Sequence, residues 1–181
     1  MNYDHIFDNF DNILNNKPII KQEEIIKTCN GYYIKTNDIE DIFREAISHS
    51  RRKTIMKDLL YKSFKNINKY KNMNFTQIFS DVNMICYNLK GIGKLSIYDI
   101  CSSICRHHNI IIDKIYIVGD GPKRAIKLLG LKTKRNNGMN YVEINDVKKA
   151  FNDKGYKKDY PKSNNGDEFE SWLCNWQKNI K

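Results

Sequence analysis

Residues 89–100 read Leu-Lys-Gly-Ile-Gly-Lys-Leu-Ser-Ile-Tyr-Asp-Ile, and this stretch decides the expected fold. Apolar residues recur at helical spacing on both sides of the two glycines, which predicts one helix that ends near Leu89 and another that begins near Ser96. Gly91 and Gly93 allow a tight turn because glycine adopts positive φ at no steric cost. The sequence therefore predicts two helices joined by a short glycine-containing turn, with Ile92 tucked into the core.

Such a turn is suited to binding a phosphate group. The backbone N–H groups of the turn and of the first helical turn after it have no partner within the helix, and the helix dipole favours an anion there. Lys90 and Lys94 add positive charge on either side. The alternative is an ordinary corner between two helices that binds nothing.

The apolar-x-Gly-apolar-Gly pattern followed by a helix resembles the hairpin of the helix-hairpin-helix DNA-binding superfamily. The resemblance covers residues 76–131 and implies that the hairpin holds one DNA strand by its phosphates without reading sequence. Together with the basic side chains nearby, it gives a set of candidate nucleic-acid-binding residues: Lys90, Gly91, Gly93, Lys94, Ser96, Arg51, Arg52, Lys123, Arg124 and Lys127.

Residues 116–131, Tyr-Ile-Val-Gly-Asp-Gly-Pro-Lys-Arg-Ala-Ile-Lys-Leu-Leu-Gly-Leu, are similar to the segment that follows the hairpin in helix-hairpin-helix DNA glycosylases. That resemblance implies a catalytic carboxylate at Asp120. The chain departs from the family in two ways: the spacing from Gly93 to Asp120 is longer, and Leu95 stands where lyase members carry a catalytic lysine. The other interpretation of Asp120 is the N-cap of a helix that begins near Pro122.

Positive charge is concentrated in the middle of the chain. Residues 46–136 carry 18 basic and 5 acidic side chains, a net charge of 18 − 5 = +13, against +10 for the whole chain. A block of this kind is typical of a nucleic-acid-binding surface, although a solvated basic face without a partner has the same composition. Lysine dominates the block, which favours phosphate contacts over base readout.

The rest of the chain predicts a mainly α fold, a single compact domain over residues 1–181 with about eight to ten helices. We expect an N-terminal helical part at 1–75, a helix-hairpin-helix part at 76–131 and a C-terminal helical part at 132–181. Expected helices, with Thr36 or Asn37 as the cap of the third, run over 5–14, 22–29, 38–47, 50–70, 74–87, 96–107, 122–129, 145–153 and 167–178. Only residues 110–118 resemble a strand, so no sheet is expected.

For several cysteine, tryptophan and basic residues we weigh a role in the fold against a role in binding. Cys101 and Cys105 lie on an apolar helix face, which favours the core over a metal site, and we expect no metal and no cofactor. Trp172 and Trp176, four residues apart, are expected in the core rather than as base-stacking platforms. Arg106 is expected near the phosphate side. Residues 49–53, which are rich in basic side chains, suit either a phosphate clamp or the start of a basic helix.

No apolar run reaches the roughly 18 residues that span a membrane, and the acidic N-terminus is unlike a signal peptide, so an intracellular protein is expected. Three functions remain open. The first is sequence-independent binding of nucleic acid, with duplex DNA as the expected partner. The second is a base-excision enzyme of the glycosylase or lyase type, acting through Asp120 in DNA repair. The third is a protein-interaction module whose hairpin is only architectural.

Overall fold

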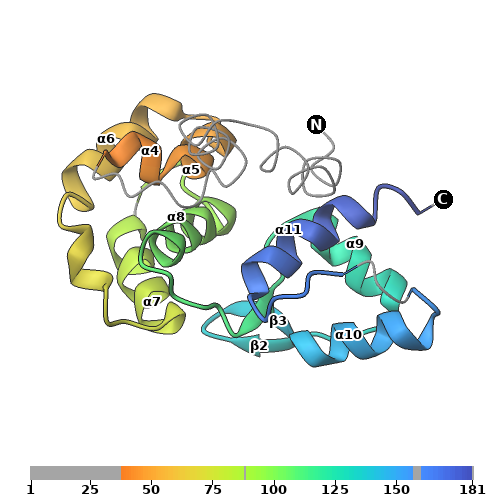
Figure 1. The fold of residues 1–181 in the computed structure, drawn as a ribbon. Helices are drawn as coiled ribbons and strands as arrows, with labels where there is room; N and C mark the ends of the chain where they lie inside the picture. Colours follow the sequence, from red (N-terminus) through yellow and green to blue (C-terminus); the bar gives the residue numbers. More distant parts are fainter. Residues whose placement is uncertain (1–37, 88, 157–159, 181) are drawn as a thin grey trace, which may run out of the picture.

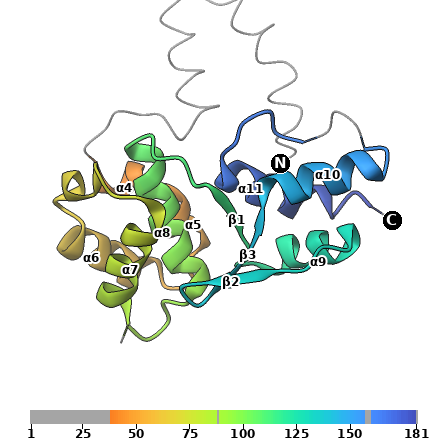
Figure 2. The ribbon, with the colours of Figure 1, turned by 90° about the horizontal axis from the view of Figure 1, so that it is seen from below.

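A computed structural model describes residues 38–87, 89–156 and 160–180 of the chain (Figure 1). The helices expected at 5–14 and 22–29, and the caps expected at Thr36 or Asn37, lie outside the described residues. The described part is mainly helical and includes a small sheet. Two groups of helices flank this sheet, α4–α8 on one side and α9–α11 on the other (Figures 1 and 2).

The first helices are short and broken. They are α4 (Ile39–Ile42), α5 (Arg44–His49), α6 (Lys53–Ser63) and the 3₁₀ turn η1 (Ile67–Tyr70). The side chain of Asp38 caps α4 by accepting a hydrogen bond from the Glu40 N–H at 2.7 Å. The helix expected over 50–70 is thus shorter and ends before Phe64. Its buried face includes Met56, whereas Ile55 is exposed.

Helices α7 (Phe75–Cys86) and α8 (Lys94–His107) confirm the two helices expected around the glycines. Asn74 starts α7 with a capping box, because its side chain accepts from the Gln77 N–H while the Gln77 side chain accepts from the Asn74 N–H. Both helices bury one face in a first hydrophobic cluster that also takes in α4–α6. The Cys101 and Cys105 thiols lie fully inside it, which confirms the core interpretation of both cysteines.

The expectation of no sheet is wrong. Strands β1 (Lys114–Tyr116), β2 (Lys134–Asn136) and β3 (Met139–Glu143) form an antiparallel sheet in the order β1-β3-β2. The two later strands are joined by a tight turn at Asn137 and Gly138, both of which have positive φ. A segment from the expected hairpin part and one from the expected C-terminal part therefore share a sheet.

The second group contains α9 (Asp120–Leu129), α10 (Ile144–Asp153) and α11 (Gly166–Trp176). They enclose a second cluster of buried side chains around Phe151 and Phe169. Trp172 and Trp176 pack against this cluster, each with its ring centroid 4.7 Å from that of Phe151, which confirms their core role. Among the described residues, no helix has the length and apolar character needed to cross a membrane.

Alternate residues of the sheet belong to different clusters. Ile115 and Ile117 face the second cluster, whereas Tyr116 between them lies in the first. On β3, Met139 joins the first cluster and Val142 the second. This is the period-two alternation of a strand with both faces covered. The sheet thus lies between the two groups of helices and contributes side chains to both hydrophobic clusters.

Candidate nucleic-acid interface

The segment between α7 and α8, residues 89–93, is a tight turn, called the glycine turn below. The Ile92 N–H donates to the carbonyl oxygen of Leu89 at 3.1 Å, and Ile92 packs against the first cluster as expected. Gly91 has φ +96°, a conformation that favours glycine. Gly93 has no such conformation. Its φ is −100° and its ψ is −177°, which is ordinary extended backbone that any residue adopts. The expectation that both glycines need positive φ is therefore wrong for Gly93.

Helix α8 begins directly after the turn. Gly93 is its N-cap and supplies no side chain to cap it, so the N–H groups of Lys94, Leu95 and Ser96 have no acceptor within the helix. The start lies two residues before the expected one, which places Ser96 in the first helical turn. No heavy atom lies within 4 Å of where a Cβ on Gly93 would stand. The space beside Gly93, the residue directly before these N–H groups, is therefore open.

Arg52, at the N-cap of α6, lies against the turn. Its Nη1 donates to the carbonyl oxygen of Lys90 at 3.4 Å, and its Cδ would stand 2.9 Å from a Cβ on Gly91. Arg51 precedes it and is exposed. The structure thus brings two separated parts of the candidate set together: Arg51 and Arg52 with the glycine turn.

Lys94 connects the turn to the sheet. Its Nζ donates to the carbonyl oxygen of Gly138 at 3.1 Å, so the start of α8 lies beside the β2–β3 turn. Strand β2 runs from there toward α9 (Figure 2). Two exposed basic side chains on it, Lys134 and Arg135, were missed as candidates because β2 was not expected. Lys134 has Glu143 at 3.4 Å, whereas Arg135 has no ion pair among the described residues.

The other candidates, Lys123, Arg124 and Lys127, are exposed on α9 and lie apart from the glycine turn. Helix α9 packs against α11 on the far side of the sheet from α7 (Figures 1 and 2). The candidate set therefore divides into one group at the turn and one on α9, with the basic strand β2 between them.

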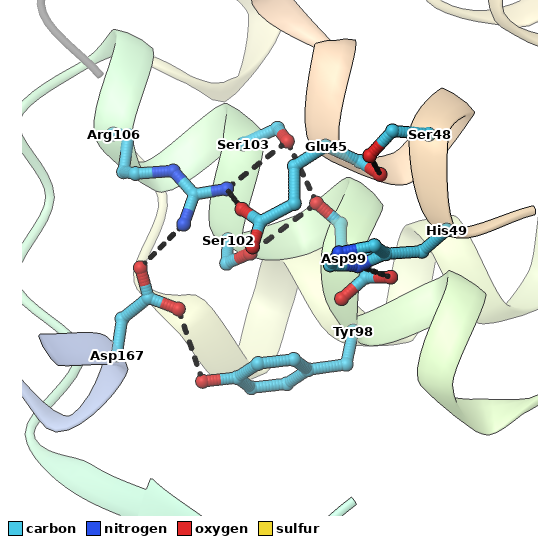
Figure 3. Close-up of polar contacts among 9 residues, drawn as sticks. All are labelled: Glu45, Ser48, His49, Tyr98, Asp99, Ser102, Ser103, Arg106 and Asp167. Carbon is cyan, nitrogen blue, oxygen red and sulfur yellow. Dashed lines mark hydrogen bonds and ion pairs between the residues drawn. The ribbon is translucent and has the colours of Figure 1, made fainter. Parts of the chain in front are cut away.

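Arg106 is not near the phosphate side, contrary to expectation. It is 12% exposed and joins the two groups of helices: Nη1 donates to Asp167 of α11 at 2.7 Å, and Nη2 donates to Glu45 of α5 (Figure 3). The Tyr98 hydroxyl donates to the other oxygen of Asp167 at 3.2 Å. Arg106 holds α5, α8 and α11 together, so it is unavailable to a ligand.

His49 and Asp99 extend this polar cluster. Nδ1 of His49 lies 3.3 Å from the Asp99 carboxylate, which is buried (Figure 3). Burial, with Glu45 nearby, raises the pKa of Asp99 to about 6 despite its contact with His49. Burial and the neighbouring carboxylates of Asp167, Asp99 and Glu45 raise the pKa of Glu170 to about 8. His49 thus faces Asp99 although half of its side chain is exposed, and Ser50 is buried, so the expected clamp keeps Arg51, Arg52 and Lys53 as exposed side chains without a carboxylate contact in the described part of the chain.

Asp120 is not the N-cap of its helix. Gly119 is, and Asp120 is the first residue of α9, with an 87% exposed side chain. The Lys123 Nζ lies 3.8 Å from its carboxylate. An acidic side chain in the first turn favours the helix through its dipole. The structure thus places Asp120 on the exposed surface of α9, with Lys123 as its neighbour.

No group of three or more histidine, cysteine, aspartate or glutamate side chains among residues 38–87, 89–156 and 160–180 is arranged to hold a metal ion. Nε2 of His108 lies 2.9 Å from the carbonyl oxygen of Ile67, so this histidine has a structural partner.

Comparisons of the chain with protein-family models, with curated proteins and with solved structures gave no match.

Proposed function

We propose that this protein binds DNA through its phosphates, without reading sequence, at the glycine turn and the basic side chains around it. The observation that carries the proposal is the start of α8, which has no side-chain cap and follows Gly93, a residue with open space beside it. Helix starts of this kind bind phosphate through the N–H groups and the helix dipole. The backbone is already fixed in this geometry, so little ordering is needed on binding.

The charges around the turn support the same ligand. Arg51, Lys53 and Lys90 are exposed and make no ion pair within the described residues, so their charge is available to a polyanion. The sequence between Asp81 and Asp99 contains no acidic residue. Phosphate groups that approach the turn therefore meet no repulsion from its own segment.

Sequence-independent binding follows from which arginines are accessible. Bidentate recognition of bases relies chiefly on arginine. Arg106 is committed to Glu45 and Asp167, and Arg52 donates to the Lys90 carbonyl oxygen. Arg51, next to Arg52, is exposed and makes no ion pair within the described residues. The remaining basic side chains around the turn are mostly lysines, which act as point charges on phosphates.

The test is a salt titration of DNA affinity with the full chain. Lys90→Ala combined with Lys94→Ala should weaken binding and make the slope of log affinity against log salt concentration shallower by about one unit per lysine. The matched control is Lys149→Ala combined with Lys154→Ala, which removes the same charge from α10 outside the basic block. Equal losses in both double variants would show that binding follows net charge alone and would remove the turn from the interface.

Unrelated duplexes of equal length should compete almost equally with one another. A preference of about a hundredfold for one sequence corresponds to about 2.7 kcal/mol, the discrimination that one to three specific base contacts supply at roughly 1–3 kcal/mol each, and would contradict the proposal.

A further inference from the structure

We propose that the apolar side chains around the glycine turn bind unpaired bases, so that the preferred DNA carries a single-stranded gap rather than being continuous duplex. The inference rests on the proposed function and specifies its ligand. It joins the phosphate site of the turn to a second surface of different chemistry on the same two helices.

The exposed apolar side chains are concentrated at this corner. Four of the nine large apolar residues that the described part leaves exposed lie within residues 84–95: Met84 at 73%, Tyr87 at 78%, Leu89 at 36% and Leu95 at 45%. The rest are scattered over other elements. Exposed apolar side chains that gather in one short segment, rather than occurring singly over the surface, indicate an interaction site.

Local geometry places these side chains on both sides of the turn. Met84 and Tyr87 lie at the end of α7, where the Tyr87 N–H faces the Met84 carbonyl oxygen at 3.5 Å. Leu89 begins the turn, and Leu95 lies in the first helical turn of α8, directly after Lys94. The corner between α7 and α8 projects from the body of the molecule, where a ligand can reach it (Figure 2).

The core contacts of this segment are made by other apolar residues. Ile92 and Ile85, from the same segment, pack against the first cluster, so the segment buries the apolar side chains that its fold needs. The four exposed apolar side chains are therefore not needed for the core packing of this segment. Lys90 and Lys94 directly neighbour Leu89 and Leu95 in the chain, and Arg52 contacts the Lys90 carbonyl oxygen. No acidic residue lies between positions 82 and 98.

Exposed apolar side chains next to basic side chains favour DNA with unpaired bases over continuous duplex. Continuous duplex presents phosphate and sugar to a helix start and keeps its base faces stacked inside, where Tyr87 and Leu95 cannot reach them. Unpaired bases expose their faces, and stacking on an aromatic side chain beside a basic groove is the usual mode of binding single-stranded segments. A gap in a duplex supplies phosphates for the turn and unpaired bases for the apolar side chains.

The experiment compares a continuous duplex with the same duplex carrying a gap of a few nucleotides, by fluorescence anisotropy with the full chain. The wild-type protein should bind the gapped DNA about tenfold more tightly. Tyr87→Ala combined with Leu95→Ala should remove most of that difference and leave affinity for the continuous duplex unchanged. Both side chains are exposed, so the variant should unfold at the wild-type temperature, which thermal denaturation checks.

The matched control is Ile111→Ala combined with Leu128→Ala, which truncates two exposed apolar side chains away from the turn and should preserve the preference. A second readout is 2-aminopurine placed in the gap, whose fluorescence should be quenched on binding by the wild-type protein and not by the Tyr87 variant.

Different results would overturn the proposed function and the present inference. Absence of any DNA binding would overturn the proposed function. Equal affinity for both DNAs, unchanged by the double variant, would overturn only the present inference. So would binding to anionic lipid vesicles, or self-association, if either were abolished by Tyr87→Ala combined with Leu95→Ala, because the patch would then serve a membrane or a second copy of the chain.

Discussion

The side chain of Arg52 occupies the space beside Gly91 that any other residue at position 91 would fill, and Nη1 of Arg52 donates to the preceding carbonyl oxygen, that of Lys90. One residue thus braces the turn and carries charge at its edge. Gly91 serves conformation and this close approach, whereas Gly93 faces open space in ordinary extended backbone. The two glycines of the motif have different roles, which substitution can separate.

Gly91→Ala should destabilise the protein by about 1–2 kcal/mol, because an alanine at φ +96° is strained and displaces Arg52. Gly93→Ala should change the free energy of unfolding little, yet weaken DNA binding because the added methyl group takes up open space directly before the start of α8. Chemical denaturation and DNA titration of both variants check this. Normal DNA affinity in a folded Gly93→Ala protein would argue against phosphate binding at the turn.

Arg106→Ala should cost about 3 kcal/mol of stability, since it leaves the buried Asp167 carboxylate without its cation and weakens the tie between α5, α8 and α11. Arg106→Lys should recover only part of the loss, because one ammonium group cannot reach both carboxylates in the same geometry. Denaturation midpoints of the two variants measure this. DNA affinity at a temperature where both are folded should equal that of wild type.

The polar cluster predicts that stability falls as the pH rises. The pKa of Glu170 is about 8 in the folded protein against 4.5 ordinarily, and that of Asp99 about 6 against 3.8, so the folded state holds both protons more tightly than the unfolded one. The stabilisation from these protons is complete below about pH 4 and is lost for Asp99 by about pH 6 and for Glu170 by about pH 8.

Glu170→Gln should therefore raise the melting temperature at pH 8–9 and flatten its fall between about pH 4.5 and 8. Glu168→Gln, which changes an exposed glutamate on the same helix, is the control. A fall in melting temperature of the same steepness in Glu170→Gln and wild type would show that other groups cause it.

Asp120→Asn should be almost neutral for folding, and Asp120→Ala should cost only about 0.5 kcal/mol, since the residue acts through the helix dipole and not as a cap. DNA affinity should be unchanged or slightly higher, because a negative charge is removed from a basic surface. Release of a base from DNA by wild type, lost in Asp120→Asn, would instead identify a catalytic carboxylate.

Elements with strong helical periodicity could be predicted from sequence, as α7, α8 and α10 illustrate. The sheet was missed because β2 and β3 are short and β2 is wholly polar, and because β1 alone gave no partner. One signal was present: Asn137-Gly138, a common two-residue β-turn. The role of Arg106 could not be read from the sequence, since Glu45 and Asp167 are each 61 residues away and only the fold brings them to it.

The sheet, whose neighbouring residues face opposite clusters, has a consequence for cooperativity. Unfolding either group of helices would expose one side of β1 and β3 to water, so neither group is expected to survive alone as a stable fragment. The chain should lose structure in a single transition, and the slowest-exchanging amides should include those of Ile115 and Tyr116. Strands of only three to five residues would then set the size of the folding unit.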